Sequence, residues 1–279
     1  MGRFRQGWEL TKRSWGVLRS NRELFRFPIY GTIAALAVTV VATGPGIYLI
    51  QDGERALGAI LTAIGLYLSA FAAIYFGVAL AATADRIFHG QPATVADGFA
   101  VARSRLGPIA GWAAVSAIVG ILITLLQQTG SIGEAIIGWL VGAVWSLITF
   151  LAVPVIALEG TGPLETLKRS ATLFKERWAG QITGNVAIGG AVVLFGVLPA
   201  ALLIVGGGYL WAAGDGEAGD TAGAALVIVG IAVLVVSMLV LQALKGVFGV
   251  ALYPFAATGE VTGGFSEAEL ESAVRRKSQ

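Results

Sequence analysis

Six long apolar stretches constrain this 279-residue chain more than any other feature of its sequence. They cover residues 27–50, 56–84, 107–127, 135–158, 182–211 and 222–257. A helix of about 20 apolar residues crosses the hydrocarbon core of a bilayer, so each stretch is long enough to span it. Only 13% of the residues are charged, against about 25% in soluble domains. We therefore predict an all-α, polytopic transmembrane helical bundle with six spans.

Two of the predicted spans contain prolines that disturb regular helix geometry. Gly44-Pro45-Gly46 is predicted to bend or end the first span near its outer edge. Pro199 removes a hydrogen bond in the middle of the fifth span, where we expect a kink. This kink has two interpretations, a packing feature and a part of a mechanism.

The distribution of lysine and arginine predicts how the chain is oriented. Of the 19 basic residues, 17 lie in the N-terminal segment, the loops after the second and fourth spans, and the C-terminal tail. The opposite loops contain only Arg55, among several carboxylates. By the positive-inside rule, both termini are predicted to be cytoplasmic. We expect a multi-pass protein of the cytoplasmic (plasma) membrane.

Basic amphipathic helices are predicted at the cytoplasmic ends of the spans. Residues 3–19 place aromatic and apolar side chains on one helical face and charged side chains on the other, and residues 163–175 repeat this pattern. Such helices are typical of the lipid headgroup layer. The alternative is that they pack against the cytoplasmic end of the bundle itself. Candidate lipid contacts are Arg5, Trp8, Lys12, Arg13, Trp15, Lys168, Arg169, Lys175 and Arg177.

Local signals place the ends of two of these loop helices. A hydrophobic helix is predicted to end near Leu158, and Pro163 suits the first position of the next helix, where its missing N–H has no cost. After the second span, Thr94 is predicted as an N-cap, with Asp97 three residues later. Short helices are therefore expected to follow the spans directly.

The order of one amphipathic helix and two spans occurs three times, in units of about 1–88, 89–160 and 161–260, before a cytoplasmic amphipathic tail at 264–279. Lys12-Arg13-Ser14 returns as Lys168-Arg169-Ser170, and Phe76-Gly77-Val78-Ala79-Leu80 returns as Phe248-Gly249-Val250-Ala251-Leu252. The units share one orientation, so we predict three parallel repeats within a single integral membrane domain, 1–279.

Few polar residues are candidates for a functional site. Lys245 is the only charge inside a predicted span, a position that is often functional; it is also close enough to the interface to snorkel. Asp85 and Glu159 end the second and fourth spans in comparable places. They are interpreted as ion-pair partners of loop arginines such as Arg169 rather than as an acid/base pair. His89 is interpreted as an interfacial histidine rather than a ligand.

The sequence contains no cysteine and one histidine, which excludes disulfides and thiolate or histidine-cluster metal sites. It contains no known catalytic or nucleotide-binding motif, and we predict no enzyme activity, no cofactor and no nucleic-acid partner. The first hypothesis is a structural, assembly or lipid-interacting membrane protein that binds anionic lipids. The alternative is a transporter or channel for a small or lipidic solute. A homo-oligomer and an unidentified membrane partner both stay open.

Several motifs are distinctive when taken together: Gly90–Gly98, Ile109–Ala117, Trp145-Ser146 with Pro154-Val155, and Glu159–Pro163 with Lys168-Arg169-Ser170. With them the chain resembles an uncharacterised family of prokaryotic integral membrane proteins, domain-of-unknown-function family 6159. The chain departs from the family pattern at Ala93, which resembles an insertion. The resemblance covers nearly the whole chain and implies six spans without an assigned activity. A remoter similarity, to the membrane domain of some glycerophosphodiester phosphodiesterases, implies no enzyme activity.

Overall fold

The computed structural model describes residues 2–127, 132–178, 192–213, 217–267 and 270. Every regular element in these residues is helical, which confirms the predicted all-α fold. The elements are α1 (Gly2–Ser20), the 3₁₀ turn η1 (Arg22–Phe25), α2 (Arg26–Val38), the π-turn η2 (Thr39–Thr43), α3 (Gly44–Gln51), α4 (Arg55–Phe88), α5 (Val95–Ser104), α6 (Leu106–Gln127), α7 (Ile132–Ile148), α8 (Ala152–Leu158), α9 (Pro163–Trp178), the π-turn η3 (Val193–Val197), α11 (Leu198–Ala213) and α12 (Glu217–Thr258).

Six helical segments are long and apolar enough to cross a membrane, as predicted. They run Arg22–Gln51, Arg55–Phe88, Leu106–Gln127, Ile136–Leu158, Val193–Ala212 and Gly219–Thr258. Residues 182–191 of the predicted fifth span lie outside the described residues. α4 and α12 contain 34 and 42 residues, or about 51 and 63 Å at the rise of an α-helix. Both project well beyond a hydrocarbon core of about 30 Å.

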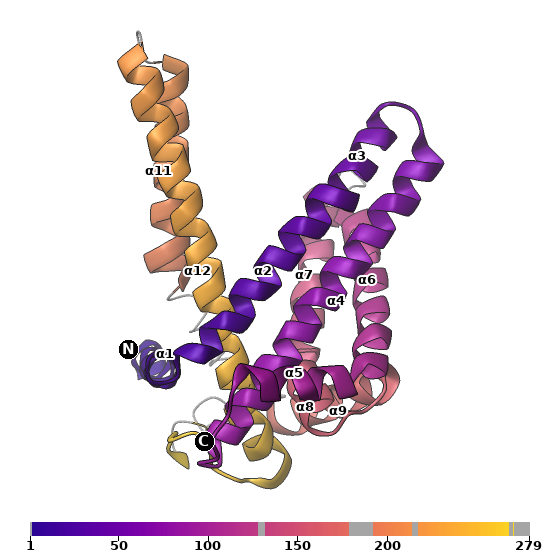
Figure 1. Ribbon diagram of the computed structural model, residues 1–279, viewed down its shortest axis with the longest axis vertical. Helices are drawn as coiled ribbons and strands as arrows, with labels where there is room; N and C mark the ends of the chain where they lie inside the picture. Colours follow the sequence, from indigo (N-terminus) through magenta and orange to yellow (C-terminus); the bar gives the residue numbers. More distant parts are fainter. Residues whose placement is uncertain (1, 128–131, 179–191, 214–216, 268–269, 271–279) are drawn as a thin grey trace.

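The spans form three hairpins that diverge from a shared layer of helices (Figure 1). α2 and α3 pack along α4, α6 packs along α7, and α11 packs along α12. We call the shared layer the base; it consists of α1, α5, α8, α9 and the last turns of α4 and α12 (Figure 1). The α11–α12 hairpin and the α2–α4 hairpin separate toward their tips, so these two hairpins meet mainly in the base, whereas α6 also packs along α4 (Figure 1).

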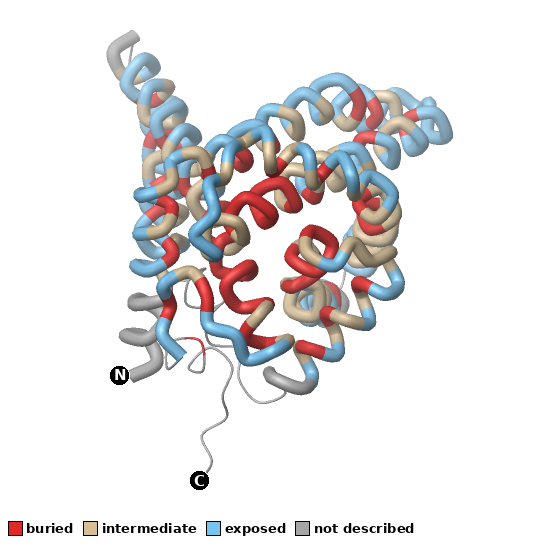
Figure 2. Tube along the Cα trace, turned by 60° about the horizontal axis from the view of Figure 1, so that its bottom comes forward, coloured by how far each residue is buried: buried red, intermediate tan, exposed pale blue. Residues whose placement is uncertain are grey.

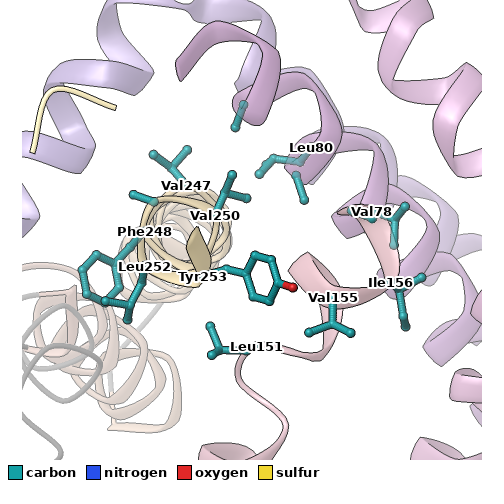
Figure 3. Close-up of a cluster of buried hydrophobic side chains, with 14 of the residues drawn as sticks. Val78, Leu80, Leu151, Val155, Ile156, Val247, Phe248, Val250, Leu252 and Tyr253 are labelled. Atoms are coloured by element: carbon teal, nitrogen blue, oxygen red, sulfur yellow. The ribbon is translucent and has the colours of Figure 1, made fainter. Parts of the chain in front are cut away.

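The buried hydrophobic core of the described chain lies in this base (Figure 2). It is built from the last turns of α4 and α12 and from α8, and Figure 3 shows its side chains gathered around Tyr253. Toward the tips, by contrast, Ile33, Val41 and Val236 are 60%, 75% and 58% exposed. Apolar surface on this scale is unusual in a soluble protein. Lipid therefore has to cover the hairpins that the base holds apart.

The two copies of the Phe-Gly-Val-Ala-Leu sequence occupy comparable places in this core. Val78 to Leu80 of α4 and Val250 to Leu252 of α12 are all buried. The glycines of both copies allow α8 to pack closely against α4 and α12. A Cβ at Gly77 would lie 3.3 Å from Val153 of α8, and one at Gly249 would lie 3.5 Å from Pro154 of α8. The placement agrees with the predicted duplication, which itself stays a prediction.

The helices of the first and fifth spans continue past their prolines. Of the two effects predicted for Gly44–Gly46, an end of the first span is excluded, because it continues as α3 to Gln51. A π-turn precedes each proline and carries the helix past it: Gly44 N–H bonds Thr39 C=O before Pro45, and Leu198 N–H bonds Val193 C=O before Pro199. In a regular helix a proline removes one backbone hydrogen bond, and its ring clashes with the carbonyl group four residues earlier. The wider π-turn makes room for the ring, so the helix can continue.

The predicted fourth span, 135–158, is not one continuous helix. α7 ends at Ile148 and α8 begins at Ala152. Pro154 explains the break, because it has no N–H for the carbonyl of Phe150 and is tolerated only in the first turn of a new helix. Thr149 Oγ1 donates to Trp145 C=O where α7 stops.

The two predicted helix starts are confirmed. α9 begins at Pro163. At α5, Thr94 Oγ1 accepts from Asp97 N–H, while the Asp97 carboxylate accepts from Thr94 N–H at 2.8 Å. The Thr94 hydroxyl also donates to this carboxylate at 2.8 Å. The two hydrogen bonds that the carboxylate accepts, from the Thr94 hydroxyl first and the Thr94 N–H second, hold the pKa of Asp97 below its usual value, with a smaller contribution from Arg86. The capping box thus fixes where the helix turns away from α4.

Candidate functional site

Lys245 of α12 lines a cavity of about 290 Å³ at the point where the hairpins meet the base. α2, α4, the end of α7, the start of α8, and α12 all contribute to its walls. Its polar lining residues are Lys245, Gln242, Ser146 and Thr149. Within the described residues, the half-buried Lys245 side chain has neither a hydrogen bond nor an ion pair. The cavity therefore offers a positive charge that no described carboxylate neutralises.

The position of Lys245 along α12 is compatible with a place near the edge of a bilayer. It lies 28 residues after Glu217, the first residue of α12, which corresponds to about 42 Å of helix. Even a strongly tilted helix crosses a hydrocarbon core of about 30 Å within that length. A lysine at this level keeps its ammonium group hydrated or paired with a phosphate.

Glu159, Arg169 and Tyr253 meet where α8, α9 and α12 come together in the base. Glu159 Oε1 accepts a hydrogen bond from Arg169 Nε at 3.1 Å. The same oxygen accepts a hydrogen bond from the hydroxyl group of Tyr253. Glu159 and Arg169 thus form the ion pair that the sequence favoured, although Tyr253 was not anticipated. The cluster ties the end of the fourth span to both the following helix and the sixth span.

Asp85 has a different partner from the one expected. Its carboxylate lies 3.6 Å from Nδ1 of His89, and Nε2 of His89 lies 3.6 Å from the carboxylate of Glu260. Arg86 is instead 3.6 Å from Asp97 of α5. In the described part of the chain, no hydrogen bond or ion pair joins Asp85 to Glu159. The two carboxylates therefore do not form a common acid/base site.

His89 links the end of α4 to the segment that follows α12. Its Nδ1 donates to the backbone carbonyl of Asp85 at 2.8 Å. This hydrogen bond, with the carboxylates of Asp85 and Glu260, raises the pKa of His89 above its ordinary value, although burial acts in the opposite direction. The protonated imidazolium is thus the form that joins the two segments.

We expect the thermal unfolding midpoint of the wild type to fall as the pH rises through the pKa of His89. A raised pKa in the folded chain means that the stabilisation is complete below the unfolded value of about 6.5 and is lost at higher pH. The side chain of His89 is 39% exposed, so the effect is small. His89→Gln should flatten this dependence between about pH 6 and pH 8. Equal slopes for both proteins would contradict the role of His89.

The predicted lipid-contact residues lie on the helices of the base. Lys12 and Arg13 of α1 and Lys168 and Lys175 of α9 are exposed, and Trp15 is 43% exposed. Arg169 is turned toward Glu159 instead. The side chains of Arg5, Trp8 and Arg177 lie outside the described residues.

The apolar face predicted for these helices is only partly correct. Leu18 of α1 is fully buried, and Leu167 and Phe174 of α9 pack against the core, whereas Leu164 is 70% exposed. Most of the described apolar side chains of α1 and α9 thus pack against the core of the base, as the alternative interpretation held. Lys12, Arg13, Lys168 and Lys175 are exposed, so their charges lie at the surface of the base.

The repeated Lys-Arg-Ser triplets contain a signal that the sequence interpretation missed. Ser14 of α1 and Ser170 of α9 are both 0% exposed. Ser170 donates to the carbonyl of Ile148, which the end of α7 leaves without a helical partner. Each triplet therefore combines an exposed lysine with a buried serine hydroxyl, whereas its arginine is exposed in α1 and paired with Glu159 in α9.

The described residues hold no group of three or more histidine, aspartate or glutamate side chains that could bind a metal ion. Residues 57–264 match the model of a family of unknown function (DUF6159). No curated protein matches the chain. The remoter similarity to a phosphodiesterase membrane domain and the prokaryotic origin stay predictions.

Proposed function

This chain belongs to the DUF6159 family of unknown function, and on that premise we propose that it is a non-enzymatic membrane protein whose base binds anionic lipids. One observation supports this proposal above all others. Exposed basic side chains of α1 and α9 lie on the base, and the apolar hairpins diverge from it (Figure 1). The charged surface and the apolar surface thus meet at one level of the molecule.

We propose further that the base faces the cytoplasm and that both termini are cytoplasmic. The support is the distribution of charge: 14 of the 19 lysine and arginine residues belong to described segments on the side of the base. The inner leaflet of a cytoplasmic membrane carries anionic lipids, and each basic residue near its surface contributes about 1 kcal/mol of binding. A few exposed cations on α1 and α9 are therefore enough for a marked preference for anionic over neutral lipids.

The carboxylates that could have served acid/base chemistry support a non-enzymatic role. Glu159 is occupied by Arg169 and Tyr253, and Asp85 faces His89. These contacts join neighbouring elements of the base, so their geometry favours a structural function for both groups. The proposal assigns the charged clusters to assembly of the base and the outward cations to lipid.

A fluorophore on α9 tests this function in the intact chain. Because the sequence has no cysteine, Thr172→Cys on the exposed face of α9 provides a single labelling site. We expect the emission to shift to shorter wavelength when phosphatidylglycerol replaces part of the phosphatidylcholine in the vesicles, because the anionic surface draws α9 toward it. Removing two charges with Lys168→Gln and Lys175→Gln should reduce the shift by about half or more.

Asp52→Cys, at the exposed tip between α3 and α4, is the matched control. Its emission should not depend on the headgroup charge. Identical emission of the α9 label in both vesicle types would contradict a lipid-binding base.

The second candidate function is a transporter or channel for a small or lipidic solute. The observation that favours it is the cavity at Lys245, which has polar groups near the membrane interface. Solute flux into proteoliposomes that is lost in Lys245→Met would support this function over the first.

A further inference from the structure

We propose that the cavity at Lys245 is a specific site for the phosphate group of one anionic phospholipid. This inference rests on the proposed function and deepens it, because it separates one defined lipid site from the general attraction of the base. The acyl chains of this lipid would lie between the α2–α4 hairpin and the α11–α12 hairpin, where these diverge (Figure 1).

The polar groups of the cavity fit an anion. Lys245 supplies an ammonium group without a described counter-ion, and Gln242 and Ser146 can each donate a hydrogen bond. Thr149 is different, because its hydroxyl proton is already given to the carbonyl of Trp145. Hydrogen bonds between a charged donor and a phosphate oxygen are among the stronger ones in proteins.

The size of the cavity fits a headgroup rather than a whole lipid. Its volume is about 290 Å³, comparable to that of about ten water molecules in the liquid. A phosphate with its glycerol or a small headgroup alcohol fits this space, whereas two acyl chains do not. The chains must therefore leave the cavity along the surface of the spans.

The remaining walls of the cavity favour a lipid over a free phosphate ion. Phe76, Leu80, Phe150 and Val153 line the space beside Lys245. A small, fully hydrated anion gains nothing from such walls and loses part of its hydration. A phospholipid buries its glycerol and the first methylene groups there, so the same apolar contacts contribute to its binding.

Lipid-dependent stabilisation of the purified full-length chain tests the site. We expect phosphatidylglycerol, added to the delipidated protein in a neutral detergent, to raise the midpoint of thermal unfolding, because a ligand that binds only the folded chain stabilises it. Phosphatidylcholine and inorganic phosphate should have little effect. Lys245→Met should raise the phosphatidylglycerol concentration needed for half of this effect by about ten- to a hundredfold, since it removes hydrogen bonds from a charged donor.

Three further variants make the result specific. Lys245→Arg keeps the charge and should still be stabilised by phosphatidylglycerol. Lys168→Met removes an exposed cation from α9 and should also still be stabilised. Ala73→Phe fills the cavity from α4 while Lys245 stays, and should lose the effect even if Lys245→Met proves too unstable to purify.

The site is overturned if Lys245→Met and Ala73→Phe respond to phosphatidylglycerol like the wild type, which would leave Lys245 as a snorkelling residue. It is also overturned as a lipid site if inorganic phosphate stabilises the wild type equally well. The two proposals fail separately, because the label on α9 reports on the base and these midpoints report on the cavity.

Discussion

Gly98→Val is expected to lower the midpoint of thermal unfolding more than any other substitution considered for this chain. α5 presses against α4 at this glycine, where a Cβ would lie 2.6 Å from the backbone oxygen of Ala79 and 2.3 Å from Thr83 Oγ1. The backbone of α4 cannot yield, so a valine has to push α5 away. Overpacking of this kind costs about 3 kcal/mol, or roughly 6–12 °C for a domain of this size.

Gly120→Val is the matched control for this prediction. Gly120 also lies within a helix, α6, but a Cβ there would meet no atom within 4 Å. We expect its midpoint to differ from that of the wild type by less than about 2 °C. Similar midpoints for both variants, measured in the same detergent, would contradict the close packing of α5 on α4.

Glu159→Ala is expected to have the second-largest effect. It removes the acceptor shared by Arg169 and Tyr253, and Tyr253 is a residue that is only 7% exposed. The Tyr253 hydroxyl would then be left buried without its partner, at a cost of about 2 kcal/mol, or roughly 4–8 °C. Glu165→Ala, an exposed glutamate in the first turn of α9, should cost less than about 1 kcal/mol.

Double-mutant cycles can divide this effect between the two partners. We expect a coupling of about 1–2 kcal/mol between Glu159→Ala and Tyr253→Phe. The coupling with Arg169→Ala should be below about 1 kcal/mol, because the two charged side chains are 30% and 40% exposed. A larger coupling with Arg169 than with Tyr253 would show that charge, rather than the buried hydroxyl, holds the cluster together.

The number of spans and the helix starts at Thr94 and Pro163 were predictable from the sequence. Hydrophobic length is a property of consecutive residues, and a capping box depends on residues three positions apart. The sequence left open whether the first span bends or ends at Pro45. Whether a helix ends at a proline or passes it by a π-turn depends on the packing of the neighbouring helix, which no local pattern records.

The candidate site was predictable only in part, for a similar reason. Lys245 stood out because a charge in an apolar span is rare, yet its cavity depends on five elements that meet only in the folded chain. Tyr253 is separated from Glu159 by 94 residues, and a tyrosine in an apolar stretch gives no sign of its partner. Asp85 was assigned to a loop arginine, whereas His89, one helical turn away, is the residue that lies beside it.

Native mass spectrometry of the wild-type chain tests the central claim, a base that binds anionic lipids, most directly. The protein is assembled into nanodiscs with equal amounts of phosphatidylglycerol and phosphatidylcholine, and the lipids that stay bound after release are counted. We predict that the retained lipids are enriched several-fold in phosphatidylglycerol, in keeping with the contribution of about 1 kcal/mol for each basic residue at the surface. Retention of the two lipids in equal amounts would contradict a base that selects anionic lipids.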